Sequence, residues 1–201
     1  SVEAVDALVR ALRYGELFAR LQAHVLRRAP RRATGPIVIR RIDLAQNELG
    51  DHQVVALAHA LRHNALVTQL HLEDNRVTCK GAAALSQLLT VNGTLVQLGL
   101  QQNQIGTSGV QSLAEALRTN ESLAVLSLGD NQMGSGGGVA LARALPANGA
   151  LRDLDLGRTQ IGGDAVVALG GALAQNAALR HLGLGGNDIG AAGAAGLAEA
   201  L

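Results

Sequence analysis

A short alternation of apolar and polar residues recurs along the chain, and each time a longer amphipathic stretch follows it. In residues 95–120, Leu98 and Leu100 alternate with polar or small residues, which predicts a short strand. Leu113 and Leu117 lie four residues apart and predict one buried face of a helix. The strand pattern returns every 28 residues, at Ile42, Leu70, Leu98, Leu126, Leu154 and Leu182.

One such unit cannot cover its own apolar face, so neighbouring units are expected to stack and share a core. The helix in each unit returns the chain to begin the next parallel strand beside the previous one. Because a helix is wider than a strand, the stack should curve. The prediction is an α/β solenoid of six 28-residue repeats over residues 37–201, a horseshoe with strands on the concave face and helices on the convex face.

Two columns of asparagine follow the predicted strands and helices. The first comprises Asn47, Asn75, Asn103, Asn131 and Asn187, with Thr159 in the fifth repeat. Its amides are expected to satisfy backbone groups of the loops, so Thr159 predicts a local weak point. The second comprises Asn64, Asn92, Asn120, Asn148 and Asn176, where we expect left-handed backbone geometry. Two glycosylation sequons, at Asn92 and Asn120, fall on this column and are interpreted as structural.

Charge is unevenly distributed, because residues 1–41 contain nine Arg and three acidic residues while the whole chain has a net charge of +1. Residues 1–36 are expected to form a helical, basic capping or flanking segment, and the repeat domain to be an excerpt of a longer protein. A candidate basic patch comprises Arg27, Arg28, Arg31, Arg32 and Arg40. It is interpreted as a solvated loop and helix end, or as a docking patch for nucleic acid or another anionic surface. No aromatic residue lies within it to stack bases.

The single cysteine, Cys79, cannot form an internal disulfide, which favours a reducing compartment and a cytoplasmic protein. No run of 18 apolar residues predicts a transmembrane segment, and the first residues lack a signal-peptide pattern.

Patterns that resemble catalytic or metal sites have simpler interpretations. His52, His59 and His63 lie along one helical stripe, but later repeats place unrelated residues at the same positions, as an exposed face would. Ser127 and His181 should lie about 10 Å apart, too far for a nucleophile and its base. The glycine clusters complete neither a Walker motif nor a dinucleotide-binding motif. Glycines within the helices instead predict that repeats four to six are softer. We therefore predict no catalytic residue, no metal site and no cofactor.

The repeat resembles leucine-rich repeats of the ribonuclease-inhibitor type, as residues 103–106 (NQIG) and 113–117 (LAEAL) show well. It is similar to the repeat regions of NOD-like receptors and Ran GTPase-activating proteins. The resemblance implies a horseshoe that binds macromolecules. It favours a non-enzymatic protein-interaction module, with the regulatory or ligand-sensing region of a NOD-like receptor as its context. The alternatives are a GTPase-activating protein of the Ran type and a structural scaffold in a cytoskeletal or ciliary assembly.

The partner, whose identity the sequence leaves open, is expected to contact the polar residues of the concave face. The candidate contacts are Arg41, Gln69, His71, Glu73, Asp74, Gln97, Gln101 and Gln102 toward the first repeats, and Arg152, Asp153, Asp155, Arg158, Arg180 and His181 toward the last. Because the repeats contain no aromatic residue, binding through this face should be weak or strongly electrostatic.

Overall fold

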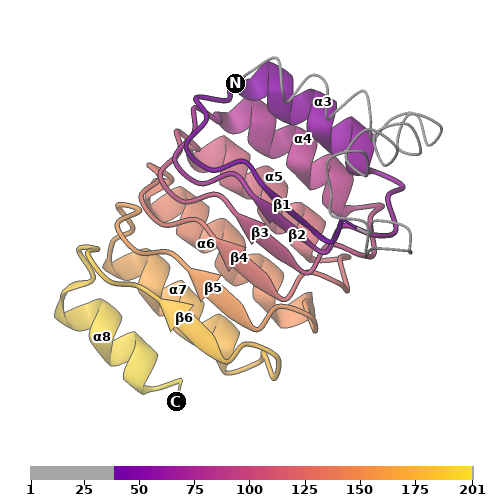
Figure 1. The fold of residues 1–201 in the computed structure, drawn as a ribbon. Helices are drawn as coiled ribbons and strands as arrows, with labels where there is room; N and C mark the ends of the chain where they lie inside the picture. Colours follow the sequence, from indigo (N-terminus) through magenta and orange to yellow (C-terminus); the bar gives the residue numbers. More distant parts are fainter. Residues whose placement is uncertain (1–38, 201) are drawn as a thin grey trace, which may run out of the picture.

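The computed structural model describes residues 39–200, which form one row of alternating strands and helices (Figure 1). The elements in chain order are β1 (Arg41–Asp43), α3 (Asp51–Leu61), β2 (Gln69–His71), α4 (Cys79–Leu89), β3 (Gln97–Gly99), α5 (Thr107–Leu117), β4 (Val125–Ser127), α6 (Gly134–Ala144), the 3-10 helix η1 (Leu145–Ala147), β5 (Asp153–Asp155), α7 (Gly163–Leu173), β6 (His181–Gly183) and α8 (Gly190–Ala198). The expected segment 1–36 lies outside the described residues.

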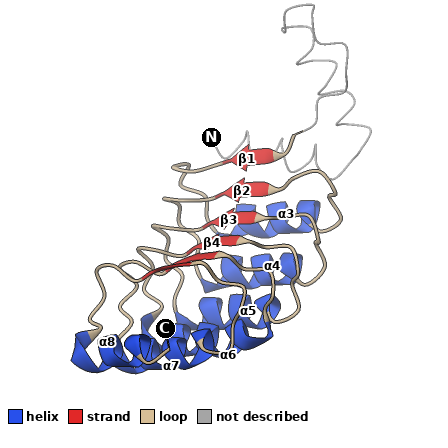
Figure 2. Cartoon of the chain, turned by 90° about the horizontal axis from the view of Figure 1, so that it is seen from below, coloured by secondary structure: helices blue, strands red, loops and turns tan. Residues whose placement is uncertain are grey.

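The six strands form a single parallel sheet in sequence order, β1 to β6. Each residue pairs with the residue one repeat later, as Leu70 does with Leu98 and Leu98 with Leu126. The helices all lie on the opposite side of the solenoid from the strands, and each helix packs against the helices of the neighbouring repeats (Figure 2). The predicted solenoid, its six repeats and its 28-residue step are therefore confirmed.

The core is a stack of aliphatic side chains between the sheet and the helices. In β1 to β5 the central residue of the strand is buried while its neighbours face outward, as Leu126 shows between Val125 and Ser127, and in β6 the central Leu182 is half-buried. Leu113 and Leu117 of α5 are buried on the opposite side of this core. Fully burying one such side chain contributes about 1.5–3 kcal/mol, so the repeated leucine columns provide most of the cohesion between repeats.

The first asparagine column bonds to backbone groups of the loops, as predicted, and some of these bonds join neighbouring repeats. Asn131 donates from Nδ2 to the carbonyl oxygens of Leu100 (2.8 Å) and Leu128 (2.9 Å), and its Oδ1 accepts from the Ile105 amide at 2.9 Å. Thr159 is fully buried, and its hydroxyl donates to the Leu156 carbonyl of its own repeat at 2.7 Å and lies 3.4 Å from Asn187 Oδ1 of the next repeat. The fifth repeat therefore lacks the side-chain bonds to the preceding repeat that the other asparagines supply.

The prediction of left-handed geometry at the second asparagine column was wrong. Asn148 has φ −91° and ψ 119°, an extended conformation, and none of the five asparagines has a positive φ. Their side chains explain the preference instead. Asn120 donates to the Leu89 carbonyl at 2.8 Å and accepts from the Leu123 amide at 2.8 Å. Asn92 and Asn120 are buried in these bonds, which supports the structural interpretation of both sequons.

Left-handed backbone occurs at another column, which consists of the residue immediately before each member of the first asparagine column. It comprises Gln46, Asp74, Gln102, Asp130, Arg158 and Gly186, with φ between 52° and 73°. A left-handed residue reverses the chain direction sharply, which sends the loop from the sheet toward the helix layer. Its side chain consequently lies at the edge of the concave face.

Candidate binding surface on the concave face

The candidate contacts divide into three groups according to their position on the sheet. Seven are outward-facing strand residues, namely Arg41, Gln69, His71, Gln97, Asp153, Asp155 and His181. Five follow the strands, namely Glu73, Asp74, Gln101, Gln102 and Arg158, and two precede them, namely Arg152 and Arg180. We use "concave face" for the outward-facing strand residues and the four residues that follow each strand.

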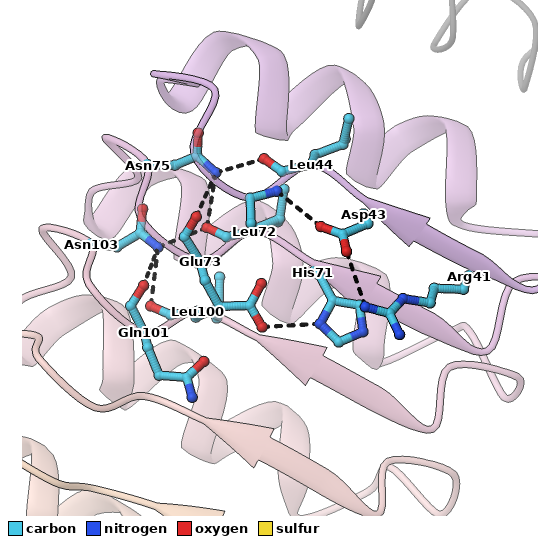
Figure 3. Close-up of polar contacts among 11 residues, drawn as sticks. Arg41, Asp43, Leu44, His71, Leu72, Glu73, Asn75, Leu100, Gln101 and Asn103 are labelled. Carbon is cyan, nitrogen blue, oxygen red and sulfur yellow. Dashed lines mark hydrogen bonds and ion pairs between the residues drawn. The ribbon is translucent and has the colours of Figure 1, made fainter.

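Toward the first repeats, two polar pairs lie side by side (Figure 3). Arg41 Nη2 donates to Asp43 Oδ2 at 3.0 Å, and His71 Nδ1 lies 3.0 Å from Glu73 Oε1. The hydrogen bond from Arg41, followed by one from the Ala45 amide, lowers the pKa of Asp43. Asp43 was not among the predicted contacts, although its position two residues after Arg41 on one strand face could have indicated the pair.

Three polar atoms in and beside this pair have no hydrogen-bond partner among residues 39–200. They are His71 Nε2, Glu73 Oε2 and Gln101 Oε1, each buried beneath neighbouring atoms of the face. Glu73 fits there because Gly99 has no side chain, and a Cβ at Gly99 would overlap the Glu73 carboxylate. Unpaired buried polar atoms each carry a desolvation cost of about 1–3 kcal/mol.

The middle of the concave face, on strands β3 and β4, is uncharged. Strands β3 and β4 carry no ionisable residue. We use "glycine floor" for four glycines that line this region and its C-terminal side, Gly99, Gly129, Gly157 and Gly183. The Asp155 carboxylate lies over the last three of them, and its Oδ1 accepts from the Gly157 amide at 3.0 Å.

Toward the last repeats the face is predominantly acidic. Sheet register places Asp153 beside His181 and Asp155 beside Gly183. Arg158 Nη2 donates to Asp130 Oδ2 at 2.6 Å, and this hydrogen bond lowers the Asp130 pKa and raises the Arg158 pKa. Asp130 was missed as a contact, although it lies one repeat length before Arg158.

Arg152 and Arg180 lie at the edge where the strands begin. Arg152 Nη1 donates to the Gly149 carbonyl oxygen at 2.9 Å, and Arg180 Nη1 donates to the Ala177 carbonyl oxygen at 2.9 Å. Both guanidinium groups are therefore held by their own loops. Arg40 is exposed just before β1, whereas Arg27, Arg28, Arg31 and Arg32 lie outside the described residues.

The structure also bears on the patterns that resemble catalytic and metal sites. Ser127 pairs with Asp155 of the next strand, and His181 belongs to the strand after that, so a nucleophile and its base are not brought together. Within residues 39–200, no group of three or more His, Cys, Asp or Glu side chains could hold a metal ion. None of the described helices is long and apolar enough to cross a membrane.

Comparisons with known proteins agree with this geometry. A family model described as a leucine-rich repeat matches residues 63–86, 91–114, 119–142, 150–170 and 175–198. No curated protein sequence matches the chain. Among solved structures, Leiomodin-1 Actin-Binding Site 2 aligns with a TM-score of 0.52 and 19% identity, over 81% of this chain and 78% of that one.

An internalin from Listeria monocytogenes aligns with a TM-score of 0.42 and 19% identity, over 73% of this chain and 42% of that one. The matched family segments each run from the end of one helix through a strand into the next helix, which is the unit that repeats in the structure. Because those segments cover more than half of its residues, the chain belongs to the leucine-rich repeat family.

Proposed function

We propose that this protein is a non-enzymatic protein–protein interaction module that binds its partner on the concave face. The observation that carries this proposal is the contrast between the columns of the repeat. Core positions such as Leu98 and Leu126 are the same from strand to strand, while the outward positions beside them differ in size and charge. A stacked solenoid presents such positions as one extended surface, which is how repeat proteins bind other macromolecules.

The context we propose is the regulatory or ligand-sensing repeat region of a cytoplasmic NOD-like receptor. The resemblance of the repeat sequence supports it, as does a single cysteine. The enzymatic alternative, a GTPase-activating protein of the Ran type, has no catalytic residue that we can assign on this chain. Adding the protein to a panel of small GTPases should leave their GTP hydrolysis rates unchanged, and acceleration of any of them would support the alternative.

Site-specific photo-crosslinking tests the binding surface. Gln97 lies on the concave face in β3, and Gln87 is exposed on the convex face in α4, so the two positions are matched in residue type. With a benzophenone amino acid at position 97, irradiation in a lysate of the source cells should give a defined adduct with another protein. The same group at position 87 should give none. Adducts from position 87 alone, or from neither position, would refute the proposal.

A second candidate is a scaffold in a cytoskeletal assembly, which the fold similarity to Leiomodin-1 Actin-Binding Site 2 favours. Co-sedimentation with actin filaments is the direct test. The scaffold is favoured over the receptor if the protein co-sediments saturably and substitution of Gln97 by the benzophenone amino acid abolishes this co-sedimentation. Retention of the protein in the supernatant would count against the scaffold.

A further inference from the structure

The concave face has an excess of negative charge that its own residues do not neutralise. Its described residues include six carboxylates, on Asp43, Glu73, Asp74, Asp130, Asp153 and Asp155, and two guanidinium groups, on Arg41 and Arg158. Both arginines are already paired, with Asp43 and Asp130. The face therefore has a formal charge of −4 when its histidines are neutral.

The four remaining carboxylates lie in two groups at opposite ends of the face. Among the residues that the structure describes, Glu73 pairs only with His71, and Asp74 follows it. Asp153 and Asp155 form no ion pair among residues 39–200. Arg152, although adjacent in sequence to Asp153, donates to its own loop instead.

Between these two groups, strands β3 and β4 carry no charged residue. The Glu73 carboxylate extends over Gly99 and the Asp155 carboxylate over Gly129, and the small Ser127 lies between the neighbouring strand residues Gly99 and Asp155. A partner that lies across the strands here meets small neutral groups in the centre and carboxylates at each end.

The spacing of the two acidic groups sets the length of that partner. Asp74 follows β2 and Asp155 lies on β5, so the two strands that carry them are three intervals of about 4.8 Å apart, or about 14 Å. An extended chain rises about 3.3 Å per residue, and its successive side chains point to opposite faces, so that residues i and i+4 share a face. Two basic residues four positions apart in an extended segment therefore match the two groups.

We infer that the concave face binds an extended basic segment of a partner protein, with two Arg or Lys side chains at i and i+4 that reach Glu73–Asp74 and Asp153–Asp155. This inference rests on the proposed function and names its partner class. Arginine suits both ends, because its guanidinium group makes paired hydrogen bonds with carboxylates.

Fluorescence anisotropy with synthetic peptides tests the inference. The probe is a labelled peptide of Gly, Ser and Thr with arginines at two positions four apart, and it should bind the full chain saturably at low salt. Replacing both arginines with glutamate, or placing them two apart, should weaken binding at least about fivefold. Raising the salt concentration to about 0.5 M should weaken it further, because exposed charges are screened. Equal binding of the basic and acidic peptides, or stronger binding of a single-stranded oligonucleotide, would overturn the inference.

Variants of the protein locate the binding site. Asp153→Asn with Asp155→Asn should weaken binding of the basic peptide about fivefold, which corresponds to about 1 kcal/mol. The matched control is Glu115→Gln with Glu121→Gln, which removes two exposed carboxylates outside the concave face and should leave affinity unchanged. Asp74→Asn, at the other acidic group, should also weaken binding. The test therefore does not rely on correct folding of the Asp153 and Asp155 variant alone.

Failure of this inference is distinguishable from failure of the proposed function. If crosslinking from position 97 persists when Asp153 and Asp155 are neutralised, and the basic peptide does not bind, the concave face is an interaction surface for a partner of different chemistry. If crosslinking from position 97 is also absent, the proposed function itself fails.

Discussion

Gly134 donates its amide proton to the carbonyl oxygen of Thr159 in the next repeat, at 3.1 Å, and adopts a left-handed conformation with φ +60°. The equivalent residues of four other repeats are extended, namely Gly50 (φ −95°), Thr78 (φ −104°), Gly106 (φ −90°) and Gly162 (φ −97°). Each of those four residues belongs to a repeat whose following repeat has Asn at the first asparagine column. The sixth repeat, with no following repeat among the described residues, again has a left-handed glycine, Gly190 at φ +63°.

The asparagine side chain explains this correlation. Asn131 Oδ1 accepts the Ile105 amide and so holds the preceding loop extended. Thr159 has no equivalent acceptor within reach of the Met133 amide, and the described residues give that amide no hydrogen-bond partner. The loop then turns at Met133 and Gly134 instead, and it bonds to the Thr159 main chain.

A double-mutant cycle between these two repeats is the first prediction. Gly134→Ala alone should destabilise the protein by about 1 kcal/mol or more, because a side chain in left-handed backbone is strained. Thr159→Asn should restore about two hydrogen bonds and stabilise by about 1–2 kcal/mol. In the Thr159→Asn background the Gly134→Ala penalty should disappear. Urea denaturation of the four proteins measures the coupling, and additive effects would contradict the loop mechanism.

The sequence predicts the architecture of this protein well because every core column repeats. Leu98 and Leu126 pair in register as the 28-residue step requires, and Asn131 bonds as its column predicts. The geometry of individual loops was less predictable. Gly134 and Gly106 share a column, and their different conformations depend on a residue one repeat later.

Predicting the concave face from sequence was limited for a related reason. Periodicity identified which residues face outward, but it could not say which of them neutralise one another. Arg158 pairs with Asp130, whereas Arg152 turns to a loop carbonyl, and nothing in their common residue type separates these outcomes. The room that Gly99 gives to the Glu73 carboxylate likewise depends on side-chain conformation between repeats.

Two adjacent glycines of α7 should respond oppositely to the same substitution. A Cβ on Gly171 meets nothing within 4 Å, so Gly171→Ala should stabilise by about 0.5–1 kcal/mol through reduced freedom of the unfolded chain. A Cβ on Gly170 would overlap the Gly196 carbonyl oxygen of α8, so Gly170→Ala should destabilise by about 1–3 kcal/mol. Thermal denaturation of both variants checks the signs. Equal effects would show that close packing of α7 on α8 does not account for Gly170.

Gly99→Ala should alter the concave face while leaving the fold intact. The new methyl group meets only the end of the Glu73 side chain, which can rotate away, so the free energy of unfolding should change by less than about 1 kcal/mol. The displaced carboxylate should lose its contact with His71. Imidazole NMR signals of His71 should shift in Gly99→Ala and remain in place in Gly93→Ala, where a Cβ meets nothing within 4 Å. Unchanged His71 signals in Gly99→Ala would show that Glu73 does not depend on this glycine.

Asp51 should make the stability of the first two repeats depend on pH. Its Oδ1 accepts from the amides of Thr78 (2.8 Å) and Gly81 (2.9 Å), and its Oδ2 accepts from the Thr78 hydroxyl at 2.6 Å. Partial burial raises the pKa of Asp51, but the hydrogen bonds from Thr78 and Gly81 together lower it by more, below its ordinary value of 3.8. The charged form is therefore favoured by folding, and its stabilisation is present above pH 4 and lost as pH falls through the lowered pKa.

Asp51→Ala should accordingly cost about 2 kcal/mol at pH 7, since it removes hydrogen bonds to a charged acceptor. The difference between the wild type and this variant should shrink as pH falls below about 4, because the wild type then loses the same contribution. Asp164→Ala is the control, since Asp164 is an exposed acidic residue in the first turn of α7 and should contribute less than about 1 kcal/mol. Urea denaturation at a series of pH values measures both differences. A constant penalty for Asp51→Ala from pH 7 to pH 2 would mean that its carboxylate charge plays no part in joining α3 to α4.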